Sequence, residues 1–253
     1  MATQGIPPAA DLMAFVEQIG SEIDEREAYE LRADLASSFA ALFGVSVQAI
    51  RLARAFGVLR GSGFGREGFV AARAAFEHAV IAQWCLHTAG GLDRLRVETH
   101  RDMRNYYGEM GRWLGDDELL ERVAEVDEFA GQKGMKRFSQ IMDDFEEGDF
   151  LKISYMNLSR VTHVTSETVT AFHLPQPDDE RAVTTNPAAK VDTQGAYIAA
   201  ASAMLAADVI GELVDDTDLL GRLDKLSDEL RIPMSLREAI PKAKRAPHPH
   251  GRD

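Results

Sequence analysis

The chain has 253 residues, 45% of them hydrophobic and 27% charged, which is typical of a folded globular protein with a sizeable core. Its formal net charge of −13 disfavours a large basic nucleic-acid surface, and its single cysteine, Cys85, excludes a disulfide framework or a cysteine-based zinc site. The sequence shows no secretory signal pattern and no run of about 20 apolar residues that would span a membrane, so we expect a cytoplasmic, bacterial-type protein.

Helical periodicity dominates the chain. Residues 9–20 predict a first helix, and residues 25–59 predict one long helix or two helices that break near Gly44. The stretch GSGFGREG predicts a turn before a helix from about residue 69 to 88, which ends at the following pair of glycines. Further helices are predicted over residues 92–114, 116–129, 135–145, 150–172, 192–214 and 218–230.

The fold class that this pattern predicts is all-α, a multi-helix bundle of about seven to nine helices. Within residues 150–172 the run VTHVTSETVT is rich in β-branched residues and could form a strand, but its apolar stripe at helical spacing favours a helix. The predicted organisation is an N-terminal helix or arm (1–24), a main bundle (25–174), a linker or lid (175–190), a C-terminal helix pair packed on the bundle (191–232) and a disordered basic tail (233–253).

Two charged residues interrupt the apolar stripe of the predicted helix over residues 69–88. Arg73 and Glu77 fall in the same arc as Phe76 and Val80, and their spacing of four lets them touch. Burying two charges costs about several kcal/mol each unless the charges are paired and hydrogen-bonded. We favour an internal ion pair that fixes helix register; the alternative is an arginine aimed at an anionic ligand, with Glu77 as its orienting group or a base.

A second polar intrusion lies in the segment YMNLSRVTH. Tyr155, Ser159 and His163 are spaced by four and form a ridge along one edge of the predicted helix, which Glu167 continues one turn later. A histidine in such a place is more often structural than catalytic. Ser159 and His163 also lack the G-x-S-x-G elbow and the α/β sheet of a serine hydrolase.

The helix ARAAFEHAVIAQW, followed later by Y-x-x-L-S-x-x-x-H, resembles an uncharacterised bacterial all-helical family that is known as a domain of unknown function. The resemblance covers residues 35–172. It implies that the two polar intrusions face each other and share an internal site made of Arg73, Glu77, Ser159 and His163, with Tyr155 beside them. Three pairs of this chain, Arg73/His78, Arg94/His100 and Arg245/His250, have an arginine and a histidine four to six residues apart. In this spacing the chain more distantly resembles the HEPN helical bundles, many of which are ribonucleases of defence and toxin systems.

Two hypotheses of function follow. The first is a nuclease-like effector of a bacterial defence or toxin system. Its roles would be His163 as general acid or base, Arg73 as phosphate ligand, Glu77 as the orienter of Arg73, Ser159 as substrate-positioning group, and Tyr155 and Glu167 as binding residues. The second is a non-catalytic sensor or protein-interaction module in which the polar cluster only specifies packing.

Cofactors and partners are only weakly indicated. No Glu-x-x-His pair of a di-iron bundle is present, and His163, Glu167 and Glu77 are a weak set of metal ligands, so we predict neither a metal nor a cofactor. The sequence leaves a homodimer and a protein partner open. It gives little support to nucleic acid and none to a membrane.

Overall fold

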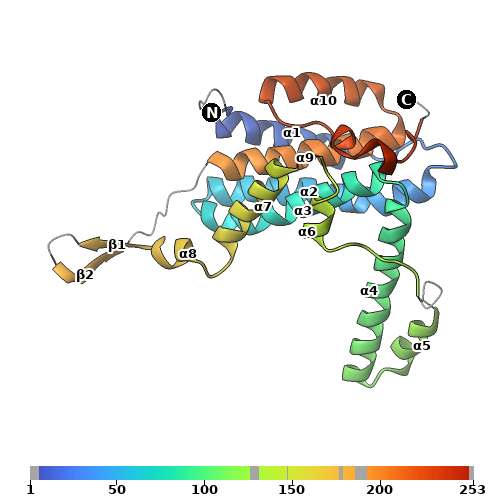
Figure 1. The fold of residues 1–253 in the computed structure, drawn as a ribbon, viewed down its shortest axis with the longest axis horizontal. Coiled ribbons are helices and arrows are strands. Elements are labelled where there is room, and N and C mark those ends of the chain that lie inside the picture. The colour runs from blue at the N-terminus through green and yellow to red at the C-terminus, as the bar shows by residue number, and fades with distance from the viewer. Residues whose placement is uncertain (1–5, 126–130, 147, 177–178, 186–192, 251–253) are drawn as a thin grey trace.

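The computed structural model describes residues 6–125, 131–146, 148–176, 179–185 and 193–250, and it is a bundle of α-helices (Figure 1). The predicted all-α, multi-helix class is confirmed: the described ranges hold ten helices, eight of which have seven or more residues. The helices are α1 (Ala9–Glu25), α2 (Ala36–Gly61), α3 (Gly65–His87), α4 (Gly91–Leu114), α5 (Asp117–Glu125), α6 (Phe138–Met142), α7 (Asp149–Thr162), α8 (Ser166–Thr170), α9 (Thr193–Val214) and α10 (Thr217–Leu230).

The core is built around α9, whose alanine-rich sequence lets neighbouring helices approach closely. This helix packs against α1, α2, α3 and α10, and it runs between them in Figure 1. Most of its side chains are buried, including Met204, Leu205 and Ile210. The largest buried side chains opposite it are Phe56 of α2 and Phe76 and Trp84 of α3. The apolar faces of these four helices thus meet on one central helix, which positions α3 inside the bundle.

Two described helices, α2 and α9, are long and apolar enough to cross a membrane by length and composition alone, although we expected no such segment. About four fifths of the apolar window of α9 is buried inside the bundle, and the core helix of a globular protein has the same composition. The corresponding window of α2 is one third buried. The burial of α9 is therefore explained by its central place among the helices.

The prediction of one helix over residues 150–172 was wrong, because α7 ends at Thr162 and α8 begins at Ser166. His163 has extended backbone angles, with φ −106° and ψ 167°, and the side chain of Thr165 caps α8 by accepting the N–H of Thr168. β-Branched residues are poor helix formers, and a threonine hydroxyl is a good N-cap. The run that was ambiguous between helix and strand therefore forms a break between two helices.

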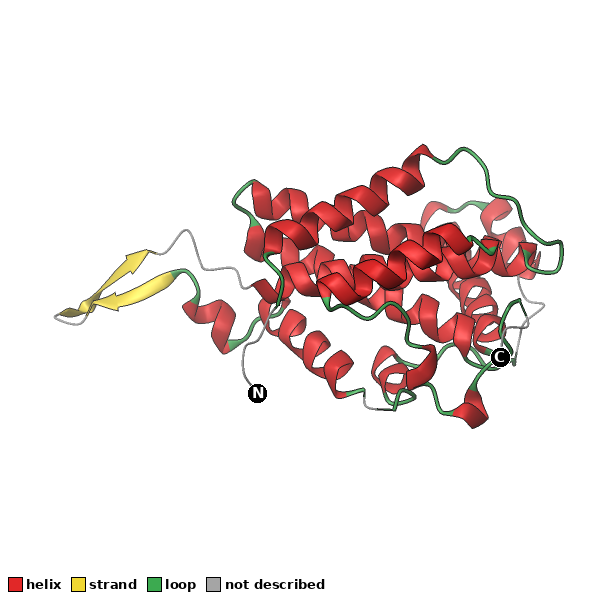
Figure 2. Cartoon of the chain, turned by 90° about the horizontal axis from the view of Figure 1, so that it is seen from above, coloured by secondary structure: helices red, strands yellow, loops and turns green. Residues whose placement is uncertain are grey.

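Residues 175–190 were expected to be a linker or lid, but part of this segment is an antiparallel hairpin of β1 (His173–Gln176) and β2 (Asp179–Thr185). Figure 2 shows the hairpin projecting from the helical body beyond α8. Several β-branched residues in β2 favour this extended conformation. Residues 177–178 and 186–190 of the predicted linker lie outside the described residues.

The prediction of a disordered tail from residue 233 was wrong for residues 233–250. Two short 3-10 helices (Arg237–Ala239 and Lys242–Lys244) follow α10, and Leu236 and Ile240 are buried in the core. The N–H of Ala246 also donates to the carbonyl of His87 at 2.8 Å, which fastens the segment to the end of α3. Two apolar anchors outweigh the basic and proline-rich composition that suggested disorder. Residues 251–253 lie outside the described part of the chain.

Candidate functional site

Arg73 of α3 joins that helix to α7. Its Nε donates to Glu77 Oε1 at 2.9 Å, its Nη1 to Thr162 Oγ1 at 3.2 Å, and its Nη2 to Tyr155 Oη at 2.7 Å. Its guanidinium carbon also lies 4.9 Å from the centre of the Tyr155 ring, a cation–π distance. One guanidinium therefore holds an acceptor on its own helix and two hydroxyls on the facing helix.

His163 completes this cluster from the end of α7. Its Nε2 lies against Nη1 of Arg73, and a guanidinium can only donate hydrogen bonds. Nε2 can therefore act only as the acceptor of this contact. The residue is exposed, because α7 ends just before it.

The structure separates the six predicted site residues into two groups. Arg73, Glu77, Tyr155 and His163 are in contact. The buried hydroxyl of Ser159 has no hydrogen-bond partner in the described part of the chain, so it does not join them. Glu167 forms ion pairs with two other arginines. Its Oε1 lies 3.3 Å from Nη1 of Arg66, and its Oε2 lies 3.8 Å from Nε of Arg160.

The ion pair of Arg73 and Glu77 is partly exposed, although its place in the apolar stripe suggested that it would be buried. The exposed fractions of the two side chains are 21% and 32%. Val70, which the helical projection placed on the apolar side, is 60% exposed, so the buried face of α3 is narrower here than the projection suggests. Water therefore reaches the cluster and reduces the stabilisation that the ion pair contributes.

A second polar network, which sequence reasoning did not identify, lies in the core between α3, α9 and the segment after α10. Gln83 Nε2 donates to Asp208 Oδ2 at 2.7 Å and to the carbonyl of Leu205 at 2.9 Å. Gln83 Oε1 accepts the N–H of Leu236 at 2.8 Å. Both ends of one buried amide are thereby satisfied, and the C-terminal segment is fixed to the core.

Burial shifts the pKa of two ionisable groups in this part of the core in favour of their neutral forms. Burial raises the pKa of Asp208 to about 7, and the nearby Glu212 adds to that rise, against the hydrogen bond from Gln83. Burial lowers the pKa of His87 to about 3, with Arg237 contributing. Asp208 lies within an apolar helix, and its partner Gln83 is 125 residues away in the chain, so the pair could not be identified from spacing.

A third cluster surrounds Asp144, which is 6% exposed. Its carboxylate accepts the Nε1–H of Trp84 at 3.0 Å and the ammonium of Lys244 at 3.1 Å, and it also pairs with Lys136. Although burial alone raises the pKa of Asp144, the two lysines and the indole outweigh it and leave the pKa below its usual range. This carboxylate stays ionised and ties the C-terminal segment to α3.

Neither metal-ligating geometry nor similarity to known proteins assigns a function to these clusters. Among the described residues, no group of three or more histidine, cysteine or acidic side chains is placed to hold a metal ion. The chain matches no protein-family model, and no curated protein or solved structure shows significant similarity to it. The resemblances to an uncharacterised helical family and to the HEPN bundles therefore stay predictions, and function is argued from geometry alone.

Proposed function

We propose that the protein is a non-catalytic binding module, a sensor or interaction protein, in which the Arg73 cluster is a structural joint between α3 and α7. The hydrogen bonding of Arg73 carries this proposal. A guanidinium has five N–H groups, and four of them are directed to Glu77, Thr162, Tyr155 and His163. A bidentate grip on a phosphate needs two parallel N–H groups, so this arrangement does not leave enough donors for one.

The nuclease-like effector is the second candidate, and one observation favours it. His163 is exposed beside Arg73, so its imidazole is accessible to a substrate. The net charge of −13 opposes binding of RNA, and the donors of Arg73 are already engaged. The joint therefore accounts for more of the geometry than the nuclease does.

Two variants of His163 separate these functions. His163→Ala removes one of the four acceptors of Arg73, whereas His163→Gln supplies an amide oxygen that can accept the same bond but cannot transfer protons near neutral pH. For a structural joint we expect His163→Ala to lower the free energy of unfolding by about 1 kcal/mol and His163→Gln to restore most of it.

The same variants are expressed in cells, and the integrity of cellular RNA is measured beside thermal unfolding. We expect intact RNA with wild type and with both variants. RNA that is degraded by wild type, and spared by both His163→Ala and His163→Gln, would overturn the proposal and establish the nuclease.

A further inference from the structure

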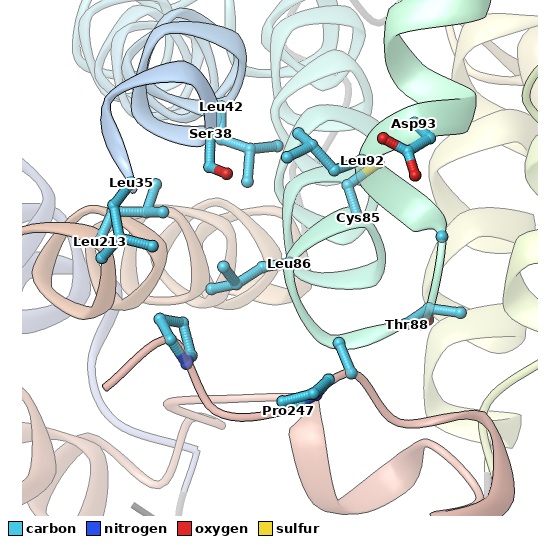
Figure 3. Close-up of a pocket in the computed structure, with 13 residues that line it drawn as sticks. Leu35, Ser38, Leu42, Cys85, Leu86, Thr88, Leu92, Asp93, Leu213 and Pro247 are labelled. Carbon is cyan, nitrogen blue, oxygen red and sulfur yellow. The ribbon is translucent and has the colours of Figure 1, made fainter. Parts of the chain in front are cut away.

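A cavity of about 250 Å³ lies at one end of the bundle, away from the Arg73 cluster. It is lined by the first turns of α2 and α4, the last turns of α3 and α9, and the segment 246–249. Figure 3 shows Ser38 and Leu42 of α2 facing Leu92 and Cys85 across this space. Segments from five parts of the chain thus converge on one hollow.

The lining is predominantly apolar. Five leucines contribute to it (Leu35, Leu42, Leu86, Leu92 and Leu213), together with Pro247 and Pro249. Its one carboxylate belongs to Asp93, whose side chain is 77% exposed and pairs with Arg96 at 3.3 Å. Because that charge is already compensated, the cavity offers no free ion as the partner of a charged ligand.

One polar group on the wall is available. The hydroxyl of Ser38 forms no hydrogen bond with the described part of the chain, and Figure 3 shows it turned toward the opposite wall. The other uncharged hydroxyl of the lining, that of Thr88, is buried. A ligand can therefore form one side-chain hydrogen bond in an otherwise apolar site.

The volume limits the size of the occupant. An apolar cavity of roughly 150 Å³ accommodates benzene, so a cavity two thirds larger takes about ten non-hydrogen atoms. We propose that the cavity binds a small, uncharged, mostly apolar molecule of about that size, with one hydroxyl-like group on Ser38. This inference rests on the proposed binding function and names its ligand class.

The C-terminal segment forms the cover of this site. The N–H of Ala246 donates to His87 and the N–H of Ala89 donates to Lys244, each at 2.8 Å, so the segment is fixed beside the cavity by backbone bonds. His250 also contacts the carbonyl of Glu212 near the end of α9. Pro247 and Pro249 are thereby held in place as part of the apolar lining.

The first test compares head groups on one chain length. Octanol, octanoate and octylamine are titrated into the full chain by calorimetry, and the pair naphthol and naphthoate repeats the comparison with a ring. We expect each uncharged compound to bind at least about tenfold more tightly than its charged counterparts, because the apolar walls offer a charge no partner. Equal affinities, or tighter binding of a charged compound, would overturn the inference.

The second test places the ligand in the cavity. Cys85 is the only thiol in the chain and lines the site, and burial raises the pKa of that thiol, so it reacts slowly with methyl methanethiosulfonate. Octanol should slow this reaction further, in proportion to its occupancy. Unchanged labelling at saturating octanol would show that binding occurs elsewhere.

Matched substitutions complete the test. Ser38→Phe should fill the cavity and abolish octanol binding, whereas Ala40→Phe, at an exposed position of α2 outside the lining, should leave it unchanged. Ser38→Ala should weaken octanol binding about fivefold by removing its hydrogen bond. If none of the compounds binds, but the His163 variants change stability as expected for a structural joint, only the ligand inference fails. If the wild-type protein cleaves RNA, the proposed function fails.

Discussion

The buried carboxyl of Asp208 gives the sharpest prediction about stability. Asp208 is 2% exposed, and burial raises its pKa to about 7, whereas the ordinary value is 3.8. Asp208→Asn keeps the shape and keeps an oxygen that can accept the 2.7 Å bond from Gln83. The variant therefore removes the titration of this group while preserving its packing.

The sign and size follow from proton linkage. Between pH 4.5 and 7 the unfolded chain has an ionised Asp208 and the folded chain a protonated one, so the stability of wild type falls as pH rises. Each pH unit changes the free energy by about 1.4 kcal/mol, which gives about 3 kcal/mol over this window. His87, with its pKa lowered to about 3, acts in the opposite direction below pH 6.5 in both proteins, so it cancels in the comparison.

Urea unfolding of wild type and Asp208→Asn at a series of pH values measures this difference directly. As the pH rises from 4.5 to 7, we expect the free energy of unfolding of the variant to increase by about 3 kcal/mol relative to that of wild type. In the variant, where Asp208 no longer titrates, we expect this free energy to rise with pH because of His87. A difference between the two proteins that does not change with pH would refute the argument, because it would mean that Asp208 is ionised in the folded state.

Two further substitutions, with a third as a control, test contacts of α3 and of its C-terminal end. Glu77→Leu should destabilise the protein by only about 1 kcal/mol, because the pair is partly exposed and Arg73 keeps its acceptors on α7; a loss above about 3 kcal/mol in urea unfolding would mean a dry ion pair. Gly91→Ala should lower the free energy of unfolding by about 2–3 kcal/mol, because the added Cβ would lie 2.9 Å from backbone atoms of Cys85. As a control, Gly44→Ala at an exposed position of α2 should raise it by about 0.5–1 kcal/mol, because nothing lies within 4 Å of the added Cβ. Equal effects of the two substitutions would contradict this reasoning.

The long helices could be predicted from the sequence because their periodicity is local. The apolar stripes over α2, α3 and α9 continue over many turns. The turn predicted at GSGFGREG is present but shorter than expected, because α2 ends at Gly61 and α3 begins at Gly65. The break at His163 was missed because a regular stripe of apolar and threonine side chains continues through it. Whether such a stripe stays helical depends on what packs against it, and α8 has no buried residue.

The site was predicted in part for the same reason. Arg73 and Glu77 are neighbours on one helix, so their contact follows from spacing, whereas the bond to Tyr155 depends on how α7 lies on α3. The Gln83 network and the Asp144 cluster each join residues that are distant in the chain. Their partners, such as Leu236, become identifiable only when the C-terminal segment is placed on the core.

The coupling between Arg73 and Tyr155 tests most directly whether the cluster is a structural joint. A double-mutant cycle with Arg73→Met and Tyr155→Phe isolates the hydrogen bond of 2.7 Å, because phenylalanine keeps the ring that the guanidinium covers. Urea unfolding of the four proteins should give a coupling free energy of about 1 kcal/mol in favour of the pair. A coupling indistinguishable from zero would contradict the structural joint and with it the proposed non-catalytic role of Arg73.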